Sequence, residues 1–223
     1  MIVDLNVNNK KAIVIGGGTE GLRKINGLLD QDCEITVITS RLNAQLKKLM
    51  ADGKINLIKS RINDVNILNQ YNDVFLILAA TDDRALNRKL VEKGRSMGAF
   101  VYAADDPVIS DFSYASLVNY EGLIQVAIST SGKSPIMARK IRMKIERMVH
   151  RSINDSDISN IILQEFARKK AKGKIGTVRE RKEFLYSLIK DKNIQHLLRS
   201  NKLNEAKMTA LHMLNNWEKV NKP

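Results

Sequence analysis

The chain has 223 residues, enough for one sizeable hydrophobic core and a smaller second unit. Hydrophobic residues make up 43% and charged residues 27%, and no apolar run of roughly 18 residues is present to form a membrane span. The single cysteine, Cys33, excludes an internal disulfide and favours a reducing, cytoplasmic location. Three scattered histidines and one cysteine offer no metal-ligand cluster, so no structural metal is expected. The N-terminus carries an acid and leads into a strand, so no signal peptide is expected.

Short apolar runs alternate with helical patterns over the first 112 residues. The expected strands cover residues 11–16, 34–39, 55–59, 74–79 and 100–104. Helical spacing is present in the segments 17–32, 43–50, 65–70 and 83–97. Strands that are apolar throughout and alternate with helices indicate a parallel sheet covered on both faces. The prediction for residues 1–112 is therefore an α/β fold, a Rossmann-like nucleotide-binding domain.

The pattern changes after residue 112. Residues 113–118 and 123–129 are predicted to be antiparallel strands around a turn at 119–122. Ser134 and Pro135 then open a helix that runs to about Arg151, with proline in its first turn. The hairpin and the helix together are predicted to form a separate region at 113–151, between the Rossmann-like domain and the C-terminal helices. A small basic helical domain is predicted at 152–223, interrupted at 172–176.

The net charge of +13 is unevenly distributed. Residues 1–132 contain 15 Lys and Arg against 15 Asp and Glu, whereas residues 133–223 contain 22 against 9. A basic region attracts polyanions such as nucleic acid, anionic lipid or a small polycarboxylate. The alternative is that these charges are only the solvated faces of helices.

A glycine-rich loop follows the first strand. Residues 16–21 (GGGTEG) fit G-x-G-x-x-G between a strand and a helix. In this context Gly16 permits the tight turn, Gly18 lets the backbone approach a pyrophosphate, and Gly21 lets the helix pack closely on the strand. The helix N-terminus offers N–H groups and the positive end of its dipole to phosphates. The alternative is a tight turn that binds nothing.

The end of the second strand reads Thr39-Ser40-Arg41. A carboxylate that holds the adenosine ribose is usual at this point of the fold. The hydroxyl groups could still bind a ribose, whereas Arg41 could pair with a 2′-phosphate. These residues therefore leave NAD and NADP open.

Two acidic pairs, Asp82-Asp83 and Asp105-Asp106, follow neighbouring strands. Both are expected at the carboxyl edge of the sheet, where this fold forms its crevice. Helix capping by Asp82 or Asp83 and turn formation by Asp106 are the preferred interpretations. Asp105 comes first after its strand, where its side chain can face the cleft and be partly desolvated. It is the candidate catalytic acid or base.

Five stretches together resemble the siroheme synthase family, whose members are precorrin-2 dehydrogenases, some of them also sirohydrochlorin ferrochelatases. They are VIGGGTEGLRK at 14–24, AATDDRALN at 79–87, DDP at 105–107, SDF at 110–112 and VAISTSGKSPIMARKIRMKIE at 126–146. These stretches cover roughly residues 1–150 in the order and spacing of the family. The helical tail resembles the C-terminal region of the family only in length and character.

The resemblance implies that NAD-dependent oxidation of precorrin-2 to sirohydrochlorin is carried out by an intertwined homodimer. It places the catalytic acid/base of the family on Asp105, places cofactor contacts on Thr19, Glu20, Ser40 and Arg41, and favours NAD over NADP. The full set of expected cofactor-binding residues is Gly16, Gly17, Gly18, Thr19, Glu20, Gly21, Thr39, Ser40, Arg41, Ala80, Thr81 and Asp82.

The substrate implied by the resemblance is a polycarboxylate, which a basic dimer would attract. The loop that enters the helix at Pro135, and the basic residues after it, are therefore candidate substrate contacts. The alternative is that they are solvated helix positions. The expected contacts are Ser129, Thr130, Ser131, Gly132, Lys133, Ser134 and Arg139, with Lys140 and Arg142 as further candidates.

Three functional questions stay open. Fe²⁺ would be a further substrate if the chain also chelates iron, but His150, His196 and His212 fall on expected helices away from the cleft motifs. A nucleotide-sensing regulator whose basic helices bind DNA is a different class of function, against which the lack of a clear recognition-helix motif argues. Another NAD-dependent oxidoreductase with a small substrate would need a narrow pocket within one subunit.

Overall fold

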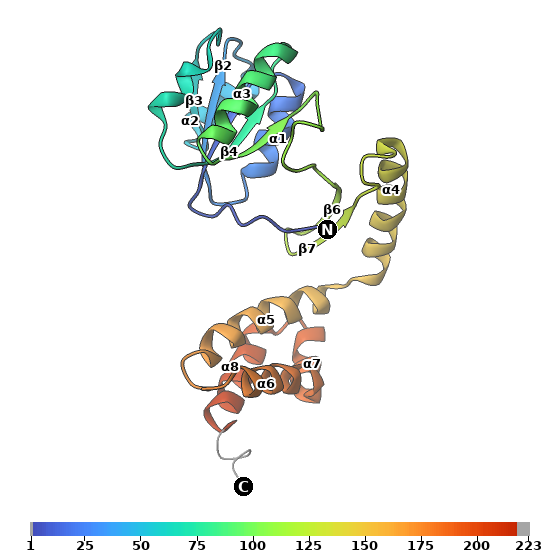
Figure 1. The fold of residues 1–223 in the computed structure, drawn as a ribbon. Helices are drawn as coiled ribbons and strands as arrows, with labels where there is room; N and C mark the ends of the chain where they lie inside the picture. Colours follow the sequence, from blue (N-terminus) through green and yellow to red (C-terminus); the bar gives the residue numbers. More distant parts are fainter. Residues whose placement is uncertain (1, 218–223) are drawn as a thin grey trace. The chain divides into compact units, whose positions relative to one another are not determined.

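The computed structural model describes residues 2–217. The chain divides into two compact units, Met1–Tyr114 and Ala115–Pro223 (Figure 1). Residues 218–223, the end of the helical domain predicted at 152–223, lie outside the described residues. Within the described part, none of the helices is both long enough and apolar enough to cross a membrane.

The first unit is a five-stranded parallel sheet in the order β3-β2-β1-β4-β5. Its strands are β1 (Lys11–Ile15), β2 (Glu34–Thr39), β3 (Asn56–Lys59), β4 (Val74–Ala79) and β5 (Phe100–Ala103). Its helices are α1 (Thr19–Leu28), α2 (Ala44–Ala51), the 3-10 helix η1 (Val65–Gln70) and α3 (Arg84–Ser96). The predicted α/β Rossmann-like fold is confirmed. The strand order reverses between β1 and β4, which is where such sheets open a crevice.

Two hydrophobic cores cover the two faces of this sheet, because alternate residues of a strand point to opposite sides. Ile13 of β1 packs in one core with Leu90 of α3. Its neighbour Val14 packs in the other core with Ile25 of α1 and Leu46 of α2. Figure 1 shows α3 crossing one face of the sheet. Burial on both faces explains why the strands are apolar throughout.

The second unit begins with a hairpin of β6 (Ser116–Tyr120) and β7 (Ile124–Ile128). The predicted antiparallel strand pair is confirmed, but its first strand runs from Ser116 to Tyr120 rather than over 113–118, and the turn is shorter than 119–122, because Asn119 and Tyr120 pair with β7. Because Tyr120 pairs with Ile124, residues 121–123 form the loop of the hairpin, in which Glu121 and Gly122 have positive φ. Tyr114 packs edge-on against Tyr102 in the first unit, with ring centroids 5.1 Å apart, so residue 114 does not join the hairpin.

Helix α4 (Pro135–Ser152) follows the hairpin and packs against β6. Ser134 caps it by accepting a hydrogen bond from the N–H of Met137, and Pro135 is in its first turn, as predicted. The remaining helices are α5 (Asp155–Ala171), α6 (Val178–Lys190), α7 (Lys192–Arg199) and α8 (Leu203–Asn215). They share a core that includes Leu163, Phe184 and Leu198. The interruption predicted at 172–176 separates α5 from α6.

Candidate functional site

A cleft of about 970 Å³ opens at the carboxyl ends of four strands in the first unit. The turns after β1, β2, β3 and β4 supply its lining, at residues 16–20, 39–43, 60–63 and 80–83. Every predicted cofactor-binding residue lines this cleft except Gly21, which lies just inside α1. Residues 60–63 were not predicted, because the turn after β3 carries neither a glycine motif nor an acidic pair.

The glycine loop is shaped by close backbone contacts. Gly16 has φ +110°, and a Cβ atom there would lie 2.2 Å from the carbonyl oxygen of Ala80. A Cβ on Gly21 would lie 1.9 Å from the carbonyl oxygen of Gly16. By contrast, the Cβ position of Gly18 has no neighbouring atom within 4 Å, and no side chain caps α1 at that residue. The loop therefore leaves the open space and the N-terminal N–H groups that a pyrophosphate needs.

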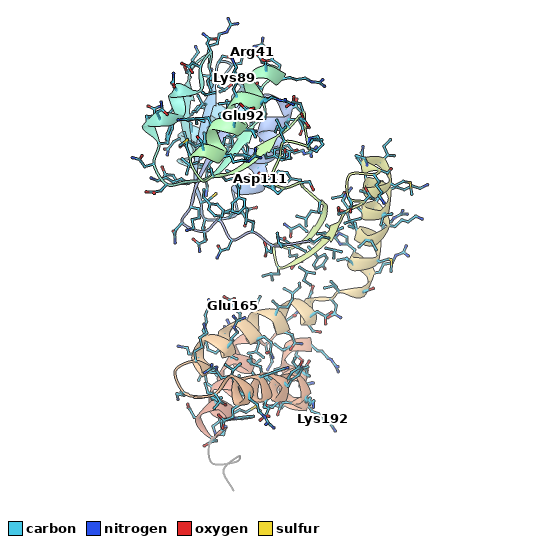
Figure 2. The ribbon with its side chains drawn as sticks, in the orientation of Figure 1. Arg41, Lys89, Glu92, Asp111, Glu165 and Lys192 are labelled. Atoms are coloured by element: carbon cyan, nitrogen blue, oxygen red, sulfur yellow. The ribbon has the colours of Figure 1, made fainter. Side chains whose placement is uncertain are left out.

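Two side chains hold the turn after β2. The Thr39 side chain donates to the carbonyl of Arg41 (3.1 Å) and accepts from its N–H (3.3 Å), so this hydroxyl shapes the turn. Asn43 caps α2 and donates from Nδ2 to the carbonyl of Gly17 (3.1 Å), which joins this turn to the glycine loop. Ser40 and Arg41 are exposed at the cleft, and Arg41 lies at one end of the unit (Figure 2). The role of Asn43 was missed, although an asparagine just before a helical pattern is a signal for a cap.

Three of the four paired aspartates cap a helix, form a turn or line the cleft. Asp83 caps α3 by accepting from the N–H of Leu86 (3.0 Å), and Asp82 is exposed and lines the cleft. Asp106 accepts from the N–H of Val108 (3.0 Å) and so forms a turn. Both contacts follow the preferred interpretation of these residues as caps and turn-formers.

Asp105 has a different environment. Its Oδ1 accepts a hydrogen bond from Nδ2 of Asn87 (2.7 Å), and its Oδ2 lies 3.7 Å from Nε of Arg84. The Asp105 side chain is only 23% exposed. It does not line the cleft, but Asn87 also binds Thr81, which does. The structure thus connects Asp105 to the cleft through one buried side chain.

Asn87 was not singled out from the sequence. It is fully buried on α3, on the same face as Leu90, Val91 and Gly94. A polar residue at a position where helical spacing demands an apolar one was the available signal. A pattern of spacing does not say which partner such a residue meets, and Asp105 lies 18 positions away in the chain.

Residues 110–112 (SDF) stabilise the turn that carries Asp105. The Asp111 carboxylate accepts bonds from Arg95 (2.7 Å) and from the N–H of Val101 (3.0 Å). The Ser110 hydroxyl accepts from the N–H of Ala103 (2.9 Å). Figure 2 shows Asp111 well apart from Arg41. These residues fasten the turn after β5 to its strand and to α3, and do not approach the cleft lining.

The predicted substrate contacts all lie in the second unit. In the loop before α4, the hydroxyls of Ser129, Thr130 and Ser134 accept bonds from the N–H groups of Ser131, Ser134 and Met137. These three N–H groups therefore already have partners within the loop. The exposed cations nearest in sequence are Lys133, Arg139 and Lys140. Gly132 completes the turn with φ +76°.

Arg142 pairs with Glu146 one turn later on α4 (2.9 Å). The three histidines lie on helices, as predicted: His150 on α4, His196 on α7 and His212 on α8. His150 packs edge-on against the ring of Tyr120 (5.1 Å). Within residues 2–217, no group of three or more His, Cys, Asp or Glu side chains could hold a metal ion.

Comparison with known proteins gives matches along most of the chain. Residues 3–116 match a family model described as "Putative NAD(P)-binding", and residues 122–148 match the model for the central part of sirohaem biosynthesis proteins. The siroheme synthase of Actinobacillus succinogenes is 34% identical over 203 residues, which is 91% of this chain and 40% of the relative. That of Neisseria meningitidis serogroup C is 34% identical over 180 residues, 80% of this chain and 35% of the relative.

The chain therefore spans about two fifths or less of the length of these curated relatives. Among solved structures, the protein described as SirC, precorrin-2 dehydrogenase, superposes with a TM-score of 0.68 at 22% identity. The match covers 95% of this chain and 99% of that one, and it supports the fold. Since the NAD(P)-binding match alone covers half of the chain, the protein belongs to that family and is a homologue of the siroheme synthases.

Proposed function

We propose that the protein is an NAD-dependent dehydrogenase that oxidises precorrin-2 to sirohydrochlorin. The observation that carries the proposal is the buried link from Asp105 through Asn87 to Thr81 at the glycine-loop cleft. It brings a partly buried carboxylate close to a cleft suited to a dinucleotide. The names of the matched siroheme synthases and of SirC support the choice of substrate.

The roles of the residues follow from what a dehydrogenation removes, a hydride and a proton. When bound, NAD supplies the hydride acceptor. The N–H groups at the start of α1, beside Gly18, would hold the pyrophosphate, and Ser40 and Arg41 would meet the adenosine side of the cofactor. The proton would go to Oδ2 of Asp105, the carboxylate oxygen that Asn87 leaves free.

The direct test is a spectrophotometric assay of NADH with precorrin-2 and NAD, run in parallel with NADP. Replacing Asp105 by Asn or Ala should lower kcat by about 10²- to 10⁴-fold, the range of a positioned acid/base, with the affinity for NAD changed little. Asp106→Asn is the matched control, because Asp106 is the next carboxylate and contacts the N–H of Val108 and the exposed Arg88 rather than Asn87. Wild-type turnover in Asp105→Ala would refute the assigned role.

A homodimer is the proposed assembly. Helix α4 has 18 residues, of which only Ala138 is buried. Its exposed apolar side chains include Met137, Ile141 and Met148, which recur on one face of the helix. A second copy of the chain would bury this face. Sedimentation should show a dimer that Ile141→Lys weakens, whereas Lys140→Ala should leave it intact; a monomeric wild-type protein would exclude this assembly.

Two further proposals concern iron and location. Insertion of Fe²⁺ into sirohydrochlorin would use the same oxygen, Oδ2 of Asp105, to accept pyrrole protons. It is tested with sirohydrochlorin and Fe²⁺ in the absence of NAD, and a rate no faster than without protein would exclude it.

A reducing, cytoplasmic location is proposed from the single Cys33, whose thiol has a raised pKa because it is partly buried.

A further inference from the structure

Asn87 makes the full set of hydrogen bonds that an amide side chain can make. Its Oδ1 accepts from the N–H of Thr81 (3.2 Å) and from the Thr81 hydroxyl (2.7 Å). Its Nδ2 donates to the carbonyl of Thr81 (3.1 Å) and to Oδ1 of Asp105 (2.7 Å). A buried amide is costly unless its groups are paired, and here two donors and two acceptors are all used. The side chain is therefore held in one geometry.

The orientation of this amide is fixed by the backbone of Thr81. The Thr81 N–H can only donate, so it requires Oδ1, and the Thr81 carbonyl can only accept, so it requires Nδ2. Rotating the amide by 180° would break both bonds. Nδ2 is thereby forced to face Asp105, which receives a hydrogen bond at Oδ1, while Oδ2 lies 3.7 Å from Nε of the exposed Arg84.

We propose that Asn87 is a positioning residue for the dehydrogenation. It turns Oδ2 of Asp105 outward for the substrate and couples that carboxylate to Thr81 in the cofactor cleft. This inference rests on the proposed function, since it gives Asn87 a role in the reaction that assigns Asp105 as the base. Asn87 is not itself a proton acceptor, because its amide is buried and fully bonded.

A neighbouring, exposed contact between α3 and the same turn serves as a control for the contact between Asn87 and Asp105. Arg88, the next residue of α3, lies 3.6 Å from Asp106, the next residue after Asp105. The Arg88 side chain is 61% exposed, whereas Asn87 is fully buried. Both contacts join α3 to the same turn. Only the buried one should fix a geometry, because an exposed pair is weak and mobile.

The test compares Asn87→Ala, Asn87→Asp and Arg88→Gln by steady-state kinetics with saturating NAD. Asn87→Ala should lower kcat by about 10- to 100-fold through misplacement of the carboxylate, with a smaller change in the KM for precorrin-2. Asn87→Asp places a second carboxylate against Asp105, so the acid limb of its pH–rate profile should move to higher pH. Arg88→Gln should retain the wild-type kcat and profile.

A double-mutant cycle separates positioning from a purely structural role. If Asn87 acts through Asp105, then Asn87→Ala should cost little further activity in an Asp105→Ala background. Equal fold-losses in both backgrounds, or wild-type kcat and pH profile in folded Asn87→Ala, would overturn the proposal. Thermal melts of each variant show whether the assay temperature lies below unfolding.

An NMR measurement keeps the proposal testable if the Asn87 variants do not fold. The side-chain N–H protons of Asn87 should exchange slowly in the wild-type protein, and Asp105→Ala should shift one of their resonances. Fast exchange, or no change on removing Asp105, would overturn the contact itself. A wild-type protein that shows the contact but makes no NADH from precorrin-2 would instead refute the proposed function, so the two failures are distinguishable.

Discussion

The first unit and the α5–α8 helices of the second use polar side chains in opposite ways. In the first unit Asn87 is fully buried and Lys24 is 2% exposed. In α5–α8 the buried residues are apolar or small, and charged side chains pair on the surface, as Arg179 does with Glu183 one turn later (3.0 Å). In the first region buried polar side chains are held in fixed positions at a cost in stability. In the second region the charged side chains stay exposed to solvent.

Buried polar side chains and surface charges have different physical effects. A buried polar network holds atoms in one arrangement, which proton transfer requires. Surface charges hold no such arrangement, but a local excess of one sign creates a field that attracts an oppositely charged ligand. The balanced charges of residues 1–132 and the basic excess of residues 133–223 fit this division. Three substitutions test this division between the two regions.

The largest effect is expected at the glycine loop. In Gly21→Ala the new Cβ would lie 1.9 Å from the carbonyl oxygen of Gly16, so the loop must move. We expect the affinity for NAD to fall by about 100-fold or more, measured by calorimetry, because misplaced N–H groups lose the pyrophosphate. Gly27→Ala, in the same helix with open space around it, should keep NAD binding and stabilise the helix by ~1 kcal/mol. Equal affinity in both variants would contradict the assigned role of the loop.

A core substitution in α6 tests whether the two regions are independent. Leu188 is fully buried in the helical core, whereas the adjacent Ile189 is 48% exposed. Leu188→Ala should lower the free energy of unfolding of the α5–α8 region by about 2 to 5 kcal/mol, and Ile189→Ala by less than about 1 kcal/mol. Urea unfolding followed by the fluorescence of Trp217, which packs on Phe184 in this core, reports the loss. A parallel loss of NAD affinity would show that the regions are coupled.

The buried amine of Lys24 makes the stability of the first unit depend on pH. Burial, with a smaller effect of Arg23, lowers the pKa of Lys24 from 10.5 to about 8. Between these values the unfolded chain keeps a proton that the folded chain has lost, so stability should rise with pH across this window, by up to ~3 kcal/mol. Urea midpoints from pH 7 to 10.5 measure the rise. It should vanish in Lys24→Met and persist in Lys47→Met, which changes an exposed lysine.

Two aromatic rings beside Lys24 could keep its amine protonated and so remove the pH dependence. The Lys24 amine lies 3.4 Å from the ring centroid of Tyr114 and 4.3 Å from that of Tyr102. Aromatic faces attract the protonated amine and so oppose the effect of burial. A flat pH dependence would mean that these rings keep Lys24 charged, and that it serves as a cation–π clamp on the end of the first unit.

The sequence alone determined the elements of the first unit and the position of its glycine loop. Apolar strands buried on both faces, and glycines at points of close backbone approach, are local features that composition and spacing record. The acidic pairs after β4 and β5 were also correctly placed at strand ends. Helix α4 was foreseen for the same reason, because Ser134 and Pro135 mark its start locally.

The contacts between polar groups follow from how the helices, strands and turns pack in three dimensions. The ring of Tyr114 packs against Tyr102, and the Thr39 hydroxyl bonds to the backbone of its own turn. The bond from Asn87 to Asp105 joins a helix to the turn after a neighbouring strand. Such contacts depend on how elements pack in three dimensions, and the periodicity of either segment carries no information about the other.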